Sequence, residues 1–452
     1  MTTTLILRST QVVTPEGVRP ASIHVSDGKI TAVRAYEDVL HKAPLDDAGD
    51  LVIMPGIVDT HVHINEPGRE DWEGFETATR AAAAGGITAV IEMPLNSIPA
   101  TTNVAALHQK IAAAQGRCHV DVGFWGGVVP GNAEDLRPLW EAGVFGFKCF
   151  LVPSGVEEFR HVTVADLRPA MRELARLDAP LLVHAELQSP IEQAEGHLPV
   201  AADPRKYATW LAMRPREAEN VAIALMIGLS VEYGVHVHVV HLVSSDALLL
   251  LKWARRDGLR ISAETCQHYL TFCAEDVPDG ATEFKCAPPI REKENRERLW
   301  AALEEGLLDL IVTDHSPAPL AMKHKETGNF QKAWGGIASL QLSLPAAWSE
   351  AHARGHSLER LARWLCSEPA RLAGLHGRKG SIAAGCDADF VIWNPQKEFI
   401  VDAATLHHRN KLTPYHARAL RGVVARTYLR GTKIFDAGEF AHGPAGQILQ
   451  RK

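Results

Sequence analysis

The stretch IMPGIVDTHVH, residues 53–63, is an apolar run that ends in two histidines. Residues i and i+2 of a β-strand point to the same face, so His61 and His63 can reach one metal ion. Seven further short apolar runs follow along the chain, and Ala- and Leu-rich helical stretches lie between them. These runs are ITAVIEMP (87–94), HVDVGFWGGV (119–128), VFGFKCFLV (144–152), PLLVHAE (180–186), VHVHVVHLV (235–243), LRISAETCQHYL (259–270) and LDLIVTDHSP (308–317).

Eight strands that alternate with helices predict an α/β fold, a (β/α)8 TIM-type barrel. Both ends of the chain have a different texture, with short β-rich runs broken by turn signals such as DGK. We therefore predict a small β-sandwich domain formed from both chain ends. Its N-terminal part is residues 1–54, starting as a β-meander, the barrel spans 55–378, and residues 379–452 add the C-terminal part and a tail.

The composition is that of a globular protein, with 46% hydrophobic and 22% charged residues among 452. A formal net charge of -7 argues against nucleic acid or an anionic membrane as the main partner. The first residues lack the pattern of a signal peptide, and no apolar stretch approaches the roughly 20 residues of a membrane span. Seven scattered cysteines without a CxxC pair indicate reduced thiols, so we expect a cytoplasmic enzyme.

Polar residues stand at the ends of the predicted strands, where a barrel of this type collects its chemistry. They are His61, His63, Lys148, His184, His241 and Asp314. His236 and His238 also form an HxH pair, but they come earlier in their strand, so we interpret them as hydrogen-bonded core histidines. His241 has the opposite parity and lies beside the loop.

Lys148 lies within the apolar run VFGFKCFLV, where a charged amine costs several kcal/mol to bury. One explanation is an ion pair with a nearby carboxylate. The other is that the neutral amine reacts with carbon dioxide to give a carbamate, N6-carboxylysine, which could bridge two cations. Four histidines and an aspartate at the other strand ends favour the second explanation.

A mixed nitrogen and oxygen ligand set with a bridging carbamate suits two divalent ions, most simply Zn²⁺, with Mn²⁺, Co²⁺ or Fe²⁺ as alternatives. Two such ions can hold a hydroxide between them. Asp314 would touch one ion, accept the proton of the nucleophile and pass it to the leaving nitrogen. The reaction class that this set indicates is hydrolysis of an unactivated amide or ester.

The whole set resembles the amidohydrolase superfamily in its cyclic-amidase branch, which includes dihydroorotases, hydantoinases (dihydropyrimidinases) and allantoinases. The resemblance covers essentially the whole chain, including the closing GSIAAGCDADFVIWNP. The stretches that look like the allantoinases are NEPGREDWEGFETATRAAAAGGITAVIEMPLNSIPATTN (65–103), FKCAPPIREKENRERLWAAL (284–303), TDHSPAP (313–319), FQKAWGGIASLQLSLP (330–345) and NKLTPY (410–415).

Two differences from the patterns of the other members narrow the choice of activity within the cyclic-amidase branch. Dihydroorotases typically carry Arg in HxHxR, where it pairs with a substrate carboxylate, but this chain has Asn65. Hydantoinases usually have a Tyr after the lysine strand, but CFLVPSGVEEFRHV (149–162) has none. The resemblance therefore implies hydrolysis of the hydantoin ring of allantoin to allantoate, in a homotetramer by analogy with relatives.

By position, the resemblance implies that His61 and His63 bind the more buried ion together with Asp314, and that His184 and His241 bind the second. Carboxylated Lys148 would bridge the two ions.

Other residues are candidates for contact with the substrate. Asn96 in MPLNS and Ser316 in TDHSP could hydrogen-bond the ring or its ureido arm. The alternatives are an Asx turn before Pro99 and a cap of the segment after Ser316. Backbone groups around Ala287 and Gly335 are further candidates. We interpret His268 as structural rather than as support for the metal ligands, and Cys149 as packing, since alternation turns it away from Lys148.

Two competing functions remain open at this point. A hydantoinase or dihydropyrimidinase-like cyclic amidase would use the same metal ligands on another ring. A non-catalytic scaffold on the same barrel would have lost ligands, whereas all six candidates are present here.

Overall fold

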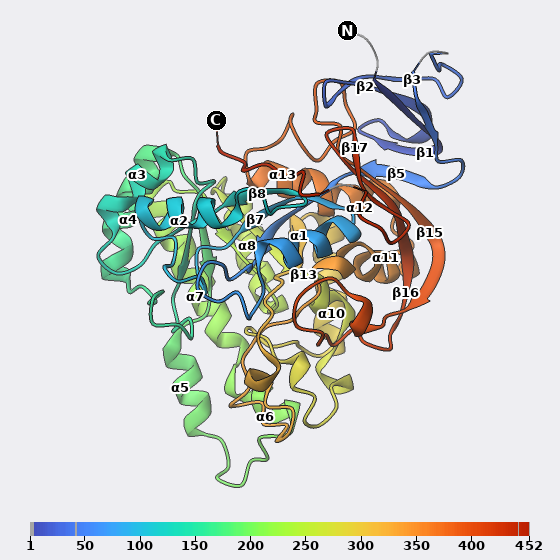
Figure 1. Cartoon of the computed structure of the whole chain (residues 1–452). Coiled ribbons are helices and arrows are strands. Elements are labelled where there is room, and N and C mark those ends of the chain that lie inside the picture. Colours follow the sequence, from blue (N-terminus) through green and yellow to red (C-terminus); the bar gives the residue numbers. More distant parts are fainter. Residues whose placement is uncertain (1–3, 41–42, 442, 452) are drawn as a thin grey trace.

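The computed structural model describes residues 4–40, 43–441 and 443–451. The first three residues of the predicted N-terminal part, 1–54, lie outside these ranges. Its centre is a barrel of parallel strands (Figure 1), as predicted. A parallel bridge between Val62 and His315 joins the last strand position to the first. The barrel strands are β6 (Ile57–Val62), β7 (Ile87–Glu92), β8 (Asp121–Phe124) continued as β9 (Gly126–Gly127), β10 (Phe147–Phe150), β11 (Leu181–His184), β12 (Val237–Val239), β13 (Ile261–Cys266) and β14 (Leu310–Val312).

Helices follow the barrel strands at the positions that the sequence indicates. Helix α4 begins with a capping box between Thr163 and Asp166. Helices α7 and α10 end where Gly234 and Gly306 adopt left-handed backbone conformations. The α-helices are α1 (Phe75–Ala84), α2 (Val104–Ala114), α3 (Leu136–Glu141), α4 (Val164–Leu177), α5 (Gln188–Gly196), α6 (Tyr207–Met213), α7 (Arg216–Tyr233), α8 (Leu248–Arg256), α9 (Gln267–Thr271), α10 (Lys293–Glu305), α11 (Ser343–Ala353), α12 (Leu358–Ala362) and α13 (Glu368–Leu372).

Both ends of the chain share one mixed sheet beside the barrel, which agrees with the predicted β-sandwich domain. Strand β5 of the N-terminal part pairs antiparallel with β15 of the C-terminal part. The N-terminal part is more than a meander, because β4 and β5 both pair with β1 in parallel. The strands are β1 (Leu5–Thr14), β2 (Gly17–Ser26), β3 (Lys29–Arg34), β4 (Leu45–Asp47), β5 (Val52–Pro55), β15 (Phe390–Ile400), β16 (Ala419–Leu429) and β17 (Thr432–Asp436).

The stretch 53–63 is two strands rather than one. It divides at Gly56, between β5 of the small domain and β6 of the barrel. A Cβ atom at Gly56 would lie 2.2 Å from the Thr88 hydroxyl, so the chain can pass this point only with glycine. This division supports the domain limits 1–54, 55–378 and 379–452, which we keep as a proposal.

A buried ion cluster connects the small domain to the barrel. Lys379 Nζ lies 2.8 Å from Asp121 of β8, 3.0 Å from Asp387 and 2.6 Å from Asp389. Burial disfavours the ammonium, but the three carboxylates outweigh it and raise the pKa of Lys379. Because Lys379 fills the centre of these carboxylates, we interpret the cluster as structural rather than as a cation site.

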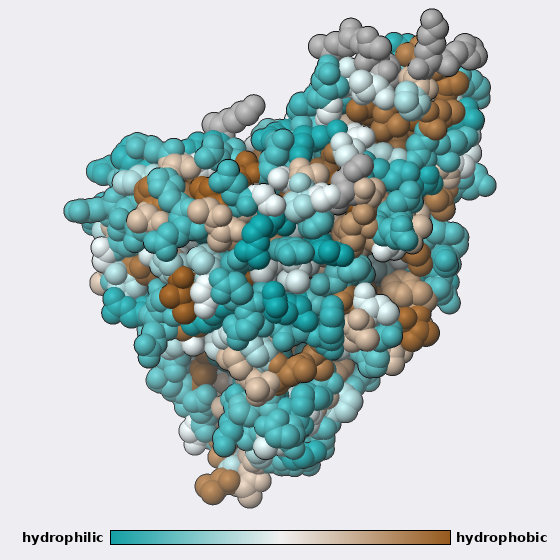
Figure 2. Space-filling model, viewed as in Figure 1, coloured by the Kyte–Doolittle hydropathy of each residue, from teal (hydrophilic) through white to brown (hydrophobic). Residues whose placement is uncertain are grey.

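None of the helices in the described ranges is long and apolar enough to cross a bilayer. The face in Figure 2 is mostly hydrophilic, with apolar residues gathered over the N-terminal strands at the upper right. All seven cysteines are buried and free, as the absence of paired spacing predicts.

Candidate metal centre

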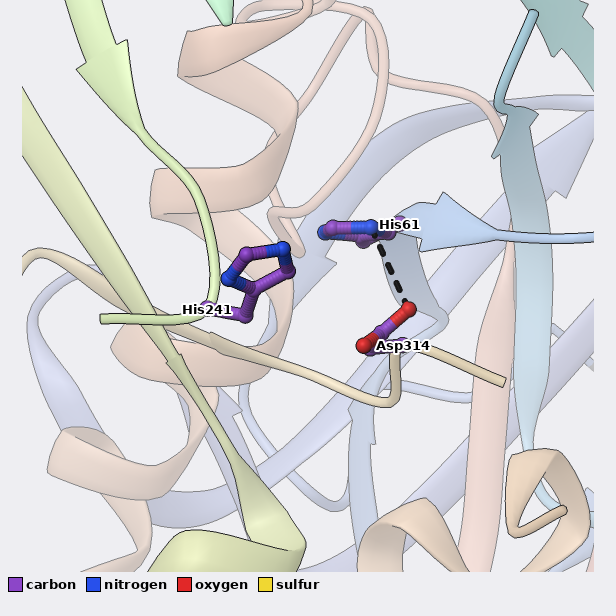
Figure 3. A group of neighbouring side chains, drawn as sticks. All are labelled: His61, His241 and Asp314. Atoms are coloured by element: carbon purple, nitrogen blue, oxygen red, sulfur yellow. Dashed lines mark ion pairs between the residues drawn. The ribbon is translucent and has the colours of Figure 1, made fainter. Parts of the chain in front are cut away.

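The six strand-end residues singled out in the sequence line one pocket, a cavity of about 350 Å³. It lies where the carboxyl ends of the barrel strands meet, as expected for this fold. Figure 3 shows His61, His241 and Asp314 pointing toward one another, His61 from β6 and the other two from the loops that follow β12 and β14. The six residues are His61, His63, Lys148, His184, His241 and Asp314.

The potential ligand atoms converge closely. One oxygen of Asp314 lies 3.3 Å from Nε2 of His61 and 3.4 Å from Nε2 of His63. Nδ1 of His184 lies 2.9 Å from Nε2 of His241. One ligand atom from each of His61, His241 and Asp314 falls within 4.8 Å of the others. The pocket thus brings together two His pairs with a carboxylate beside the first.

Left-handed backbone conformations turn two of these side chains inward. His241 and Asp314 each come two residues after the end of their strand, with φ of 41° and 43°. Such values are strained for residues other than glycine and concentrate at functional sites. At His241 the turn breaks the alternation of β12, so a residue of the opposite parity to His236 and His238 can face the pocket.

His236 and His238 are both hydrogen-bonded, as interpreted from the sequence, and His238 is fully buried whereas His236 is half-buried. Nε2 of His236 and Nδ1 of His238 each lie 2.7 Å from the Ser262 hydroxyl. Nε2 of His238 donates to Glu264 at 3.1 Å. Neither histidine lines the pocket.

Lys148 is fully buried in β10, and its Nζ has no hydrogen-bond partner among the described residues. No ion pair to a carboxylate is present there either, which removes the first explanation for a buried lysine. Burial lowers the pKa of Lys148 to about 8, against the weaker opposing effect of Asp314 and Glu264. The lowered pKa raises the fraction of the Lys148 amine that is neutral near pH 7, and the neutral amine is the form that reacts with carbon dioxide.

Burial favours the neutral form of three of these imidazoles, which is the form that binds metals. Burial lowers the pKa of His63 to about 4 and that of His184 below its ordinary value. It lowers the pKa of His241 further still. For Asp314 burial acts in the opposite direction, but the three surrounding histidines outweigh it and hold its pKa well below the ordinary value.

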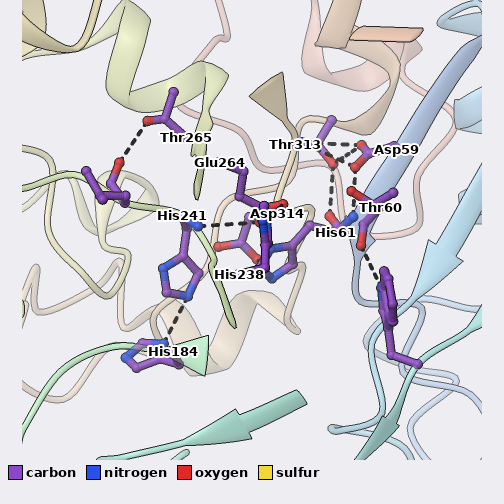
Figure 4. Close-up of polar contacts among 12 residues, drawn as sticks. Asp59, Thr60, His61, His184, His238, His241, Glu264, Thr265, Thr313 and Asp314 are labelled. Carbon is purple, nitrogen blue, oxygen red and sulfur yellow. Dashed lines mark hydrogen bonds and ion pairs between the residues drawn. The ribbon is translucent and has the colours of Figure 1, made fainter. Parts of the chain in front are cut away.

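Glu264, on β13, supports the site and was not singled out in the sequence. It accepts a hydrogen bond from Nδ1 of His61 at 2.5 Å and also binds His238 (Figure 4). Burial opposes its ionisation, but these two histidines lower its pKa to about 2. By fixing the proton of His61 on Nδ1, Glu264 leaves the Nε2 lone pair facing the pocket. A second buried carboxylate, Asp59, binds the His61 amide at 3.0 Å and the Thr313 hydroxyl at 2.6 Å.

Replacing Glu264 with glutamine is expected to weaken divalent-metal binding about 10- to 100-fold, because an amide orients His61 less strongly than a carboxylate does. Competition with a chromogenic chelator measures this affinity directly. Glu232→Gln is the matched control, since Glu232 pairs with Arg168 on the surface. Equal affinity in the Glu264 and Glu232 variants would contradict the role given to Glu264.

Glu186 and Arg214 form a second unpredicted pair, on the His184 side. One oxygen of Glu186 accepts from Nε2 of His184 at 2.8 Å and from Nη1 of Arg214 at 2.5 Å. Burial opposes ionisation of Glu186, but Arg214 and His184 lower its pKa to about 2. Arg214 itself lines the pocket. Glu186 is the last residue of the run LLVHAE, but its role beside His184 is recognised only once the structure is known.

The other predicted residues divide into two groups. Asn96, Ser316, Ala287 and Gly335 line the pocket. Nδ2 of Asn96 lies 3.4 Å from Nδ1 of His63, and the Ser316 hydroxyl donates to one Asp314 oxygen at 2.8 Å. The second group does not line the pocket and is fully buried: Asn65, His268 and Cys149.

Asn65 occupies a left-handed conformation, φ 68°, with its Nδ2 3.4 Å from the Pro317 carbonyl oxygen. Asn65 therefore lies outside the pocket lining. Cys149 belongs to the apolar cluster between barrel and helices, as alternation predicts.

The donor set fits a pair of divalent ions. Neutral imidazole nitrogens and a carboxylate are ligands that Zn²⁺ and similar ions prefer. The unpartnered amine of Lys148 among them is unfavourable as it stands, and a carbamate would turn it into an oxygen ligand. Such a site can activate water and polarise a carbonyl.

Comparison with known proteins agrees with this chemistry. The profile of the Amidohydrolase family matches residues 52–434. The chain is 53% identical to an allantoinase of Streptomyces avermitilis, over 99% of both chains. It is 43% identical to an allantoinase of Arabidopsis thaliana, over 98% of this chain and 90% of the relative. The solved structure of an L-hydantoinase (dihydropyrimidinase) from Arthrobacter aurescens superposes over 100% of both chains, with a TM-score of 0.94 and 32% identity.

Proposed function

The chain belongs to the amidohydrolase family, and from that premise we propose that it is an allantoinase, which hydrolyses the cyclic amide bond of allantoin to give allantoate. The observation that carries the proposal is the convergence of neutral histidines, Lys148 and Asp314 on one pocket. The likeness to allantoinases over nearly the whole chain supports the choice of substrate.

In this proposal the six residues hold two divalent ions. His61, His63 and Asp314 would hold one ion and His184 and His241 the other, and Lys148, as N6-carboxylysine, would help to hold both. Bound ions would supply a nucleophile near neutral pH and polarise the scissile carbonyl. The support is the donor chemistry of these side chains and the lack of any partner for Lys148 Nζ in the described structure.

Asp314 moves the proton. Its carboxylate, which the histidines keep ionised, accepts a proton from the nucleophile and delivers it to the ring nitrogen that leaves. Ser316 donates to the same carboxylate and holds its orientation. Together with Asn96 and the backbone of Ala287 and Gly335, Ser316 also faces the substrate.

The pocket suits a neutral ring better than a carboxylate-bearing one. Asn65 stands where an arginine would clamp an anion, and it does not line the pocket. Arg214 does line it, but Glu186 neutralises its charge. We therefore expect weak binding of dihydroorotate.

A substrate panel tests the proposal. Purified protein is assayed on allantoin, hydantoin, dihydrouracil and dihydroorotate under one set of conditions. We expect the highest kcat/KM on allantoin. A higher kcat/KM on dihydrouracil or hydantoin would overturn the choice of substrate and leave the hydrolase chemistry standing.

The second candidate is a hydantoinase, favoured by the close likeness to the solved L-hydantoinase. Against it, no tyrosine lines the pocket in the described part of the chain, and Phe150 stacks on His184 after the lysine. A non-catalytic scaffold is a more remote alternative, and protein that neither binds metal nor turns over any panel substrate would favour it.

The proposal also covers the metal, the cellular location and the oligomeric state of the enzyme. We expect zinc as the metal, with Mn, Co or Fe as alternatives, because the ligand set accepts several divalent ions. A cytoplasmic location is supported by seven unpaired cysteines. A homotetramer follows from the family resemblance, and exposed Val231, Leu249 and Trp253 on the adjacent helices α7 and α8 support assembly.

A further inference from the structure

Arg214 presents unused hydrogen-bond donors at the pocket wall. It follows α6 and its side chain is 17% exposed. Its Nη1 donates to Glu186, and across the described residues its Nε and Nη2 have no hydrogen-bond partner. A guanidinium carries five N–H donors in a planar fork, so most of them remain available at the cavity.

The position of this fork is fixed relative to the proposed metal ligands. The same Glu186 oxygen accepts from His184 and from Arg214, so the guanidinium lies next to the His184 side of the site. Arg214 also packs over the Trp210 ring at 5.4 Å. Trp210 is itself held by its Nε1, which donates to the Cys286 carbonyl oxygen at 3.2 Å.

The neighbouring pocket lysine cannot take the same role. Nζ of Lys285 donates to the carbonyl oxygens of Gln331 at 3.2 Å and Ala333 at 2.5 Å. The Lys285 ammonium is therefore already engaged with a segment that also lines the pocket. Arg214 has the free donors, and a buried oxygen of Glu186 beside it has no partner in the described structure.

We propose that Arg214 determines substrate specificity by donating N–H groups to the carbonyl oxygen of the ureido arm of allantoin. This inference rests on the proposed function. The ring amide must lie on the His and Asp cluster to react, so the arm extends toward the wall. A urea carbonyl is neutral, and Glu186 removes the net charge that would otherwise favour an anion.

The test compares two ligands that differ by the arm. In Arg214→Gln, kcat/KM for allantoin is expected to fall about 10- to 100-fold, mostly through KM, as for the loss of a hydrogen bond to a charged donor. Hydantoin has the ring without the arm. Its Ki as a competitor of allantoin is expected to change less than about threefold, because no ring contact is lost.

Two further variants separate specificity from structure. Arg214→Lys keeps a charge beside Glu186 but loses the fork, so an intermediate rise in KM is expected. Arg168→Gln is the matched control, since Arg168 pairs with Glu232 on the surface, and it should leave both constants unchanged. Bound metal is measured in every variant, and if Arg214→Gln loses metal, the Arg214→Lys variant carries the comparison.

The outcomes are distinct. Equal losses for allantoin and hydantoin would overturn the inference, because Arg214 would then serve the ring or His184. Unchanged KM for allantoin would overturn it as well. A wild-type protein inactive on allantoin would overturn the proposed function and this inference with it, whereas an active wild type with an indifferent Arg214 would overturn the inference alone.

Discussion

Lys148→Ala is expected to reduce allantoin hydrolysis by at least about a thousandfold, because the bridging ligand supports charge stabilisation worth several kcal/mol. The residue is fully buried, and its amine contacts no hydrogen-bond acceptor in the described structure. An ordinary structural lysine would not be placed in this way. Bound divalent metal should fall below two ions per chain.

Chemical rescue of Lys148→Ala distinguishes a carbamate on Lys148 from a role of this residue in packing alone. Small carboxylic acids can enter the space left by the side chain and replace the bridging oxygens, so they should restore part of the activity of Lys148→Ala. Cys149→Ser is the matched control, because the adjacent side chain packs in the apolar cluster. Full activity of Lys148→Ala without added acid would contradict the proposal, and a thermal unfolding curve checks that the variant is folded.

Asp314→Asn is expected to lower kcat about a thousandfold at saturating metal, within the range for a lost general base or acid. Asparagine keeps the volume and one oxygen, but it cannot accept the proton. The effect should appear in kcat rather than in KM. Steady-state assays with metal content determined on the same samples measure it.

The control for this variant is Asp246→Asn, since Asp246 lies at the surface 3.4 Å from Arg216. It should retain wild-type kcat. An Asp314→Asn enzyme that keeps bound metal and loses less than about tenfold in kcat would contradict the role of Asp314 as proton carrier.

The barrel and the candidate ligands could be predicted because both repeat a local pattern. Each strand is a short apolar run, and each candidate ligand lies in such a run or directly after it, so chain order alone places them at one end of a barrel. The His61 and His63 pair also obeys simple strand alternation. These features depend on neighbours a few residues apart.

The supporting residues could not be predicted, because their partners are distant in the chain. Glu264 binds His61 across 203 residues, and nothing near Glu264 marks that pairing. Arg214 meets Glu186 only through the packing of α6 against the pocket. The left-handed conformation of His241 could not be predicted either, because positive φ is uncommon outside glycine even at asparagine, aspartate and histidine, where it is enriched.

Asn65 shows what the sequence can indicate about specificity and what only the structure adds. Asn65 stands where dihydroorotases carry an arginine that pairs with a substrate carboxylate. The sequence alone therefore argues against a carboxylate-bearing substrate. The structure adds that Asn65 is buried beside Pro317 and outside the pocket lining. Its contribution to specificity is therefore the absence of a cation rather than a contact.

Metal reconstitution tests whether hydrolysis depends on two divalent ions. Protein stripped with a chelator is titrated with Zn²⁺ while bound metal and the rate of allantoin hydrolysis are followed on the same sample. We expect an inactive apoprotein whose activity rises to a plateau at two bound ions per chain. Full allantoin hydrolysis by protein without bound divalent metal would contradict it.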